Sequence, residues 1–236
     1  MSIVKMKGIV IAENNMGDFD KMLTMLTPGC GKISCVAKGA RRPKSSLLAG
    51  TQFLCFGEYV MYKGQEHYTI NSCDVIEVFY NIRTDLDKLQ EATYITKIIQ
   101  NVTNENENSY KILKLFLNTL YMISETDKDL KFITSVFKLK LLCFLGFKPQ
   151  VEKCVNCGTT ENLRFFSIKD NGCKCQDCGT QDKGAIKISD STYLSLKYIV
   201  LAPPKKLYSF ELKNESLNEL NLVSKLYFNE KLEKEF

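Results

Sequence analysis

The chain carries the stretch Cys154-Val-Asn-Cys157 and then, after the seventeen residues 158–174, Cys175-Gln-Asp-Cys178. This stretch decides the local fold, because its spacing fits that of C-x₂-C-x₁₅₋₂₀-C-x₂-C zinc sites. Each pair can turn two thiolates toward one point, and two pairs supply the four sulfurs of a tetrahedral Zn²⁺ ion. Such a site has no open coordination position. The sequence therefore predicts a structural zinc module, with Cys154, Cys157, Cys175 and Cys178 as ligands.

Other interpretations of these cysteines stay open. A Cys-x-x-Cys pair is also a redox motif, although no thioredoxin-like βαβ pattern surrounds either pair. Such pairs can also arise by chance in a chain with 10 cysteines. Gly158 and Gly179 follow the second cysteine of each pair, where a turn around a metal favours a residue that can adopt positive φ. Cys173 is an additional thiol that could compete as a ligand.

The composition is that of an ordinary globular protein, with 44% hydrophobic and 25% charged residues among 236. The N-terminus has no apolar run typical of a signal peptide, and no stretch is long enough to span a membrane. We therefore expect a cytoplasmic protein without membrane contact, in which the cysteines are reduced or metal-bound.

An enzymatic role is disfavoured by the residues that acid–base chemistry would need. His67 is the only histidine, and no nucleophile stands beside it. A zinc deaminase would need a glutamate two residues after the histidine and an open metal position, but that residue is Thr69. The G-x-x-x-x-G-K-[ST] string of ATP-binding loops is absent from the sequence. We expect no catalytic activity.

Strand patterns occupy the first 80 residues and helical patterns follow. Strands are expected near 7–12, 33–37, 53–62 and 70–79, about five in all, as in a small closed barrel or sandwich. From residue 84 onward apolar residues recur at helical spacing, with Thr84-x-x-Asp87 as the expected first cap. Gly146 and Pro149 predict a helix end, Ser189 a helix start, and 203–204 a stop.

A cluster of basic residues lies in a loop pattern between two predicted strands. Gly39 and Pro43 predict a flexible loop, and no Asp or Glu occurs in residues 21–57. Lysine and arginine side chains pair with phosphates and release counterions, which gives salt-dependent affinity for nucleic acid without sequence preference. A merely solvated loop is the competing interpretation. The predicted DNA-binding residues are Lys32, Lys38, Arg41, Arg42 and Lys44.

Aromatic residues follow the basic loop on the predicted strands. Phe53, Phe56, Tyr59 and Tyr62 could offer faces on which unpaired bases stack. Alternating aromatics also fill the interior of a barrel, which is the expectation for at least half of them.

Several strings of the chain are typical of one known family: 7–10, 17–28, 31–45, 56–59, 141–149 and Phe165-Phe-Ser167. The most specific is Gly39-Ala-Arg-Arg-Pro-Lys-Ser45. With them the chain resembles the bacterial RecO family of recombination mediators, from Lys7 to about Gly179. The resemblance implies an α+β fold: an N-terminal OB-fold β-barrel for DNA binding over 1–80, a mainly α-helical domain over 81–150 and 184–236, and a four-cysteine zinc-binding module over 151–183.

The resemblance also implies a function. Members bind single- and double-stranded DNA, anneal complementary strands and, with RecR and RecF, promote RecA loading on DNA coated by the single-strand-binding protein SSB. They recognise the acidic-hydrophobic C-terminal tail of SSB and act at the nucleoid. Asn171 replaces a glycine found in many relatives, and neither it nor Cys173 removes a ligand. For the tail contact, the candidates are Lys138, Lys140 and Lys148.

Two alternatives to a DNA-contacting mediator stay open. The chain could be an adaptor that bridges RecR and SSB without touching DNA, with the basic loop serving solubility. It could also be a zinc-ribbon transcription factor, although no helix with clustered Arg, Asn or Gln follows the cysteines.

Overall fold

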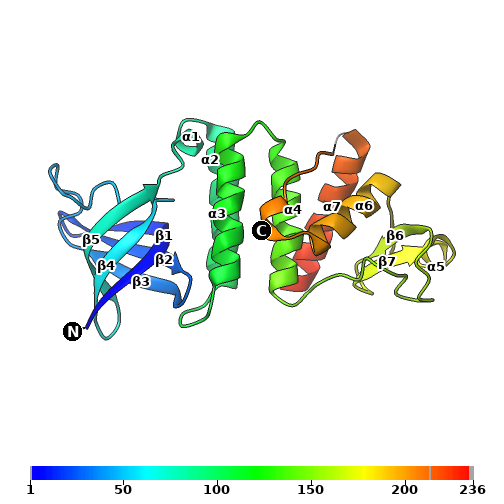
Figure 1. Cartoon of the computed structure of the whole chain (residues 1–236), viewed down its shortest axis with the longest axis horizontal. Helices are drawn as coiled ribbons and strands as arrows, with labels where there is room; N and C mark the ends of the chain where they lie inside the picture. The colour runs from blue at the N-terminus through cyan, green and yellow to red at the C-terminus, as the bar shows by residue number, and fades with distance from the viewer. Residues whose placement is uncertain (1, 213, 234–236) are drawn as a thin grey trace. The chain divides into compact units, whose positions relative to one another are not determined.

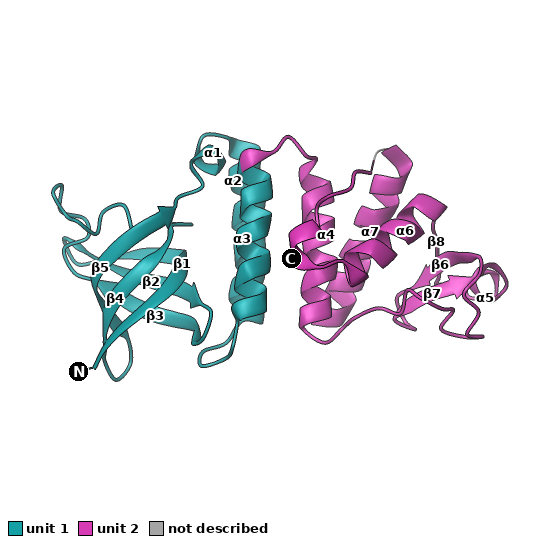
Figure 2. Ribbon diagram, in the orientation of Figure 1, with its two compact units in different colours: residues 1–124 teal, residues 125–236 magenta. Residues whose placement is uncertain are grey.

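The computed structural model describes residues 2–212 and 214–233 (Figure 1). Internal contacts divide the chain into two compact units, residues 1–124 and 125–236 (Figure 2). Each unit is described by itself. None of the helices in the described part of the chain combines the length and the hydropathy that a membrane span needs.

Unit 1 begins with a closed five-stranded barrel in the order β1-β2-β3-β5-β4. Strand β1 closes the barrel by pairing with β4, from Ser2 opposite Lys63 to Ile9 opposite Phe56. Strands β3 and β5 pair in parallel, and the other neighbours pair antiparallel. This confirms the predicted α+β class with an N-terminal barrel. The strands are β1 Ser2–Met16, β2 Asp20–Thr27, β3 Gly31–Ala37, β4 Phe56–Lys63 and β5 Tyr68–Glu77.

The barrel interior is filled by side chains at alternate strand positions, as the pleat requires. Tyr59 on β4 is fully buried, and its hydroxyl donates a 2.7 Å hydrogen bond to Gly50 O. A buried tyrosine needs such a partner, so Tyr59 is a core residue rather than a stacking surface. The buried core cluster comprises Val10, Leu23, Met25, Ile33, Cys35, Ala37, Ala40, Leu47, Cys55, Tyr59, Met61 and Ile70.

Three helices complete unit 1: α1 Tyr80–Arg83, α2 Leu86–Val102 and α3 Tyr110–Glu125. The cap of α2 is Asp85, whose carboxylate accepts from Lys88 N at 3.1 Å. The predicted Thr84–Asp87 cap was therefore one residue early; the Thr84 hydroxyl instead donates to Asn81 O at the end of α1.

Helix α2 is tied to the barrel by polar contacts. The Gln100 side chain donates to Ile11 O at 2.5 Å, and the Lys32 ammonium donates to Gln100 O at 2.8 Å. Lys32 N also donates to Asn104 O at 3.0 Å. The units defined by contacts thus place α1 to α3 with the barrel, whereas the sequence assigned 81–150 to a helical domain. The predicted three-part division stays a prediction.

Unit 2 contains three longer helices, α4 Leu130–Phe144, α6 Asp190–Leu201 and α7 Asn214–Leu232. Gly146, with φ +95°, follows α4. The Ser189 side chain caps α6, and Pro203 lies just beyond its end, as predicted. A small sheet in the order β7-β6-β8 adjoins them. Its elements are β6 Leu163–Ser167, β7 Gly172–Cys175, the short helix α5 Gln176–Thr180 and β8 Ile186–Lys187; a 3₁₀ turn spans Pro204–Lys206.

Two of the lysines considered for a partner contact lie inside unit 2. Lys138 and Lys140 on α4 are each only 6% exposed. The Lys140 ammonium donates to Ile199 O, Val200 O and Ala202 O at 3.1, 3.2 and 2.8 Å. It therefore satisfies carbonyls that the end of α6 leaves without partners. Only Lys148 of the three is exposed.

Candidate metal centre and nucleic-acid interface

The four predicted cysteine ligands converge on one point. The sulfur atoms of Cys154, Cys157, Cys175 and Cys178 all lie within 4.8 Å of one another. The sulfurs of Cys157 and Cys175 are 3.7 Å apart. A Zn–S bond of about 2.3 Å in a tetrahedral site gives a sulfur–sulfur edge of about 3.8 Å. The cluster thus has the donor set and the dimensions of a metal site.

The first pair sits in a turn built by backbone hydrogen bonds. Cys154 N donates to Thr159 O at 2.7 Å, and Gly158 N donates to Cys154 O at 3.0 Å. Gly158 has φ +77°, a conformation that residues with a Cβ rarely adopt. The predicted positive φ after the first pair is confirmed.

The second pair is held differently. Cys175 ends β7, and Cys178 lies in α5 directly before Gly179. Gly179 is not among the residues with positive φ, so the predicted turn role is wrong for this glycine. A Cβ at position 179 would instead collide with the ring of Phe165. The glycine is needed because α5 packs closely on β6.

The environment of Cys154 favours a thiolate. Burial raises the pKa of its thiol, but backbone N–H groups of Cys157, Cys175 and Asn156 donate toward the sulfur and lower the pKa to about 6. A thiolate is the form that binds metal. Cys173 differs: it is buried outside the cluster, and burial raises the pKa of its thiol to about 12. The structure therefore gives Cys173 no place among the four converging sulfurs.

An ion-pair network around the buried Lys174 on β7 lies next in sequence to the second cysteine pair. The Lys174 side chain is 5% exposed, and its ammonium contacts Asp170 at 2.5 Å and Asp182 at 2.7 Å. The Ser167 hydroxyl, a single donor, lies within hydrogen-bond distance of both carboxylates, 3.0 Å from Asp170 and 3.1 Å from Asp182. These contacts fasten the β6–β7 turn and the segment after α5, which together frame the second cysteine pair.

The basic loop spans residues 38–55 between β3 and β4. Four of the five predicted DNA-binding residues are exposed on it: Lys38, Arg41, Arg42 and Lys44. The fifth, Lys32, is partly buried on β3, and its ammonium donates to Gln100 O. The structure therefore brings four predicted cations together on one loop and holds Lys32 apart from them.

The loop is anchored, not the flexible arm that Gly39 and Pro43 predicted. Gly39 N donates to the Asp20 carboxylate at 2.7 Å, and Arg41 N donates to Phe19 O at 2.9 Å. These bonds hold the start of the loop against the turn between β1 and β2. The loop glycine and proline gave no indication of them, because the acceptors lie about twenty residues earlier in the chain.

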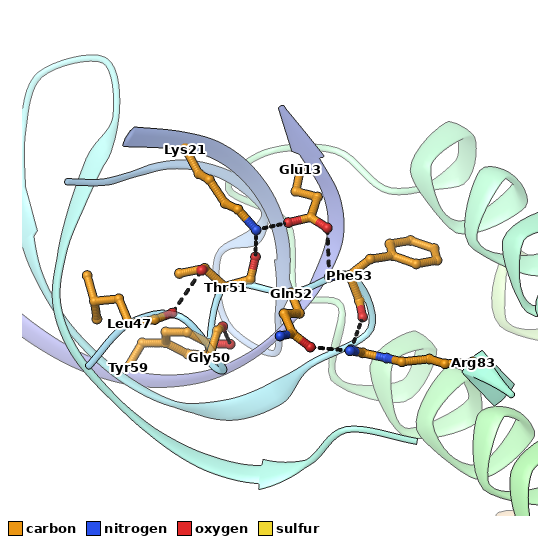
Figure 3. A network of polar contacts seen from close by, with 9 residues as sticks. All are labelled: Glu13, Lys21, Leu47, Gly50, Thr51, Gln52, Phe53, Tyr59 and Arg83. Atoms are coloured by element: carbon orange, nitrogen blue, oxygen red, sulfur yellow. Dashed lines mark hydrogen bonds and ion pairs between the residues drawn. The ribbon is translucent and has the colours of Figure 1, made fainter. Parts of the chain in front are cut away.

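A second set of contacts fixes the last part of the loop, at Thr51 and Phe53, as Figure 3 shows. The Lys21 ammonium forms an ion pair with Glu13 and donates to Thr51 O at 3.3 Å. Glu13 also accepts from Phe53 N at 3.4 Å. Lys21 is thus a structural cation, although it lies in the same acid-free window as the exposed ones.

The end of the loop is held by α1. Arg83 donates to the Gln52 side chain and, at 2.6 Å, to Phe53 O (Figure 3). The loop backbone is therefore pinned to β1, β2 and α1, so that its exposed arginines project from a fixed support. Such pre-organisation lowers the entropy lost when a partner binds.

The aromatic residues suggested as stacking surfaces are not freely exposed. Tyr59 is buried, and Phe53, Phe56 and Tyr62 are partly buried. The exposed aromatic beside the loop is Phe19, with 48% of its side chain accessible. The Arg42 guanidinium lies 5.3 Å from the centre of its ring. Sequence reasoning missed Phe19, because its proximity to the loop follows from the register of β2 and β3, which sets Lys21 opposite Ala37.

Comparison with known proteins gives matches over nearly the whole chain. Residues 1–79 match the family described as Recombination protein O N terminal. Residues 83–236 match the family described as Recombination protein O C terminal. The junction of the two matches falls at α1.

Full-length relatives agree with these matches. The chain is 46% identical over 237 residues to the DNA repair protein RecO of Acetivibrio thermocellus, covering 100% of this chain and 94% of the relative. It is 34% identical to that of Alkaliphilus metalliredigens, covering 95% and 92%. It is 33% identical to that of a Thermoanaerobacter species, covering 100% and 95%.

Proposed function

The chain belongs to the RecO family, and from that premise we propose that it is a recombination mediator in DNA repair. It binds single- and double-stranded DNA, anneals complementary strands and, with RecR and RecF, promotes RecA loading on SSB-coated DNA. The observation that carries the proposal is the group of four exposed cations on the anchored loop 38–55.

The proposed mechanism is electrostatic. Lys38, Arg41, Arg42 and Lys44 contact backbone phosphates and release condensed counterions. Two strands bound in this way repel one another less, and complementary base pairing then supplies the free energy of annealing. Lys32 is the fifth predicted contact; it would have to exchange its bond to Gln100 O for a phosphate. No bond in the DNA is made or broken, so the protein acts without catalysis.

We propose Zn²⁺ as the ion held by Cys154, Cys157, Cys175 and Cys178. Four thiolates at tetrahedral spacing are the ligand set of structural zinc. The ion contributes folding free energy to its surroundings, since a site of this kind does not exist in the unfolded chain. With all four positions taken by sulfur, it supplies no reactive centre.

The partners follow from the family. RecR, RecF, RecA and the C-terminal tail of SSB are the proposed protein partners, and the nucleoid of the bacterial cytoplasm is the proposed location. The burial of Lys138 and Lys140 removes both from the surface on which an SSB tail would dock. Lys148 is the remaining candidate.

A direct test measures the salt dependence of DNA binding. Fluorescence anisotropy of a labelled single-stranded oligonucleotide should give a steep loss of affinity with salt. In an Arg41/Arg42/Lys44→Ala variant the slope of log K against log salt should flatten by about 2, at about 0.7 per phosphate. A Lys111/Lys183/Lys205→Ala variant, which removes three exposed lysines elsewhere, should keep the wild-type slope.

The second candidate, an adaptor that bridges RecR and SSB without touching DNA, predicts a different result. The basic loop would then serve solubility, and wild type would show no salt-dependent binding to naked oligonucleotide. Binding of wild type with an unchanged slope in the loop variant would place the DNA contact elsewhere on the chain.

A further inference from the structure

Phe19 is an aromatic residue that the barrel core does not use. It lies in the three-residue turn between β1 and β2, and 48% of its side chain is exposed. A large apolar side chain on a tight turn loses hydrophobic free energy by facing water. Because the ring lies beside the basic loop and is exposed, it can contact a bound ligand, which a ring buried in the core could not do.

The ring and two arginines form one supported surface. Phe19 O accepts from Arg41 N at 2.9 Å, and the Arg42 guanidinium lies 5.3 Å from the ring centre, within the range of a cation–π contact. The Arg41 side chain donates to Gly17 O at 3.3 Å in the same turn. The turn also carries the exposed Asp18, one negative charge against the four positive charges of the loop.

An exposed ring among cations matches the chemistry of an unpaired nucleic-acid strand. Proteins bind single strands by pairing basic side chains with phosphates and stacking aromatic rings on bases. A duplex presents the same phosphates, but its bases are stacked on one another and offer no free face. The arginines can therefore bind either form, whereas the ring can contribute only to the unpaired one.

We propose that Phe19 stacks on a base of single-stranded DNA and gives the site its preference for unpaired strands. This inference rests on the proposed DNA binding by loop 38–55 and adds the residue that discriminates between the two forms. A single ring contributes a modest amount, about tenfold in affinity. A bound strand can therefore still leave the ring when its complement arrives.

The test compares Phe19→Leu with wild type on a single-stranded 20-mer and on the matching duplex. Leucine keeps an apolar side chain of similar size but has no π face. We expect about tenfold weaker binding of the single strand, unchanged binding of the duplex, and an unchanged salt slope for both, because no phosphate contact is lost. Tyr121→Leu is the matched control, since Tyr121 is also an aromatic residue and 54% exposed, but lies on α3 and not on the loop. It should leave both affinities unchanged.

A second variant reports stacking directly. The chain contains no tryptophan, so Phe19→Trp introduces a single indole at the proposed contact. Its fluorescence should be quenched by the single-stranded 20-mer and remain unchanged with the duplex, while its affinity for the single strand stays at or above that of wild type.

The outcomes separate this inference from the function on which it rests. If wild type binds neither form of DNA, the proposed function fails and this inference fails with it. If wild type binds but Phe19→Leu loses no affinity for the single strand and the indole is not quenched, only the stacking role is overturned. Equal losses for single strand and duplex would also overturn it, because Phe19 would then merely support the arginines.

Discussion

Replacement of Lys140 by methionine should destabilise unit 2 by removing a buried cap. The Lys140 ammonium donates to three carbonyls at the end of α6, those of Ile199, Val200 and Ala202, over 2.8 to 3.2 Å. The residue is 6% exposed, so water has little access to replace it. Methionine keeps an unbranched apolar side chain as far as the ε position but cannot donate to the carbonyls at the end of α6.

The magnitude follows from the number of bonds and one opposing effect. A hydrogen bond to a charged group contributes about 1.5–3 kcal/mol. Burial lowers the pKa of Lys140, which shows that the charged form is disfavoured where it lies. Methionine removes that cost. We therefore reduce the contribution to about 1 kcal/mol net for each of the three bonds, below that range, and expect a loss of about 3 kcal/mol in the free energy of unfolding. Typical domains have about 5–15 kcal/mol in total.

Urea unfolding followed by far-ultraviolet circular dichroism measures this loss. Lys131→Met is the matched control, because Lys131 lies on the same helix but is exposed; it should change the free energy of unfolding by less than about 0.5 kcal/mol. Equal stability of the two variants would show that the α6 carbonyls are satisfied without Lys140 and would contradict its role as a cap.

Three other expectations concern the metal cluster and the packing of unit 2. Cys175→Ser removes one of four ligands and should yield protein with less than one zinc per chain and a lower melting temperature; retained zinc with unchanged melting would contradict the site. Gly179→Ala should cost about 1–3 kcal/mol by forcing a methyl group against the Phe165 ring, whereas Gly184→Ala, whose Cβ would only make an ordinary 3.5 Å contact with the Asp182 carboxylate, should not. Burial raises the pKa of Glu219, but donors from Thr192 and Ser189 lower it below the usual value. Its contribution to stability is therefore present above about pH 4.3 and lost as pH falls through the lowered pKa. The difference in free energy of unfolding between wild type and Glu219→Gln should therefore shrink as the pH falls from about 4.3 through the lowered pKa. A difference that persists at pH 2 would contradict a stabilising role for the Glu219 carboxylate.

Local patterns predicted those features that depend on neighbouring residues. The spacing of Cys154, Cys157, Cys175 and Cys178 predicted a cluster because each pair and the hairpin between them are local. Strand alternation predicted the barrel, and Ser189 and Gly146 predicted helix ends, because caps act within one turn.

Features set by tertiary contacts could not be read from the sequence. The sequence suggested that Gly179 is a turn glycine. A glycine is needed there for another reason, because the Phe165 ring on β6 leaves no room for a Cβ. Lys32 and Lys140 have the sequence context of surface cations, yet each caps carbonyls on an element more than fifty residues away. Phe19 lies about twenty residues before Arg42, and the pairing of β2 with β3, which sets Lys21 opposite Ala37, brings the two together.

We propose that the exposed cations of loop 38–55 bind DNA and allow complementary strands to anneal. Annealing of two complementary labelled oligonucleotides, followed by fluorescence with and without SSB, tests it most directly. We predict rapid annealing by wild type and by the Lys111/Lys183/Lys205→Ala control, and a rate near the protein-free background for Arg41/Arg42/Lys44→Ala. Annealing by the loop variant at the wild-type rate, or wild type that binds SSB but never anneals the strands, would contradict the claim.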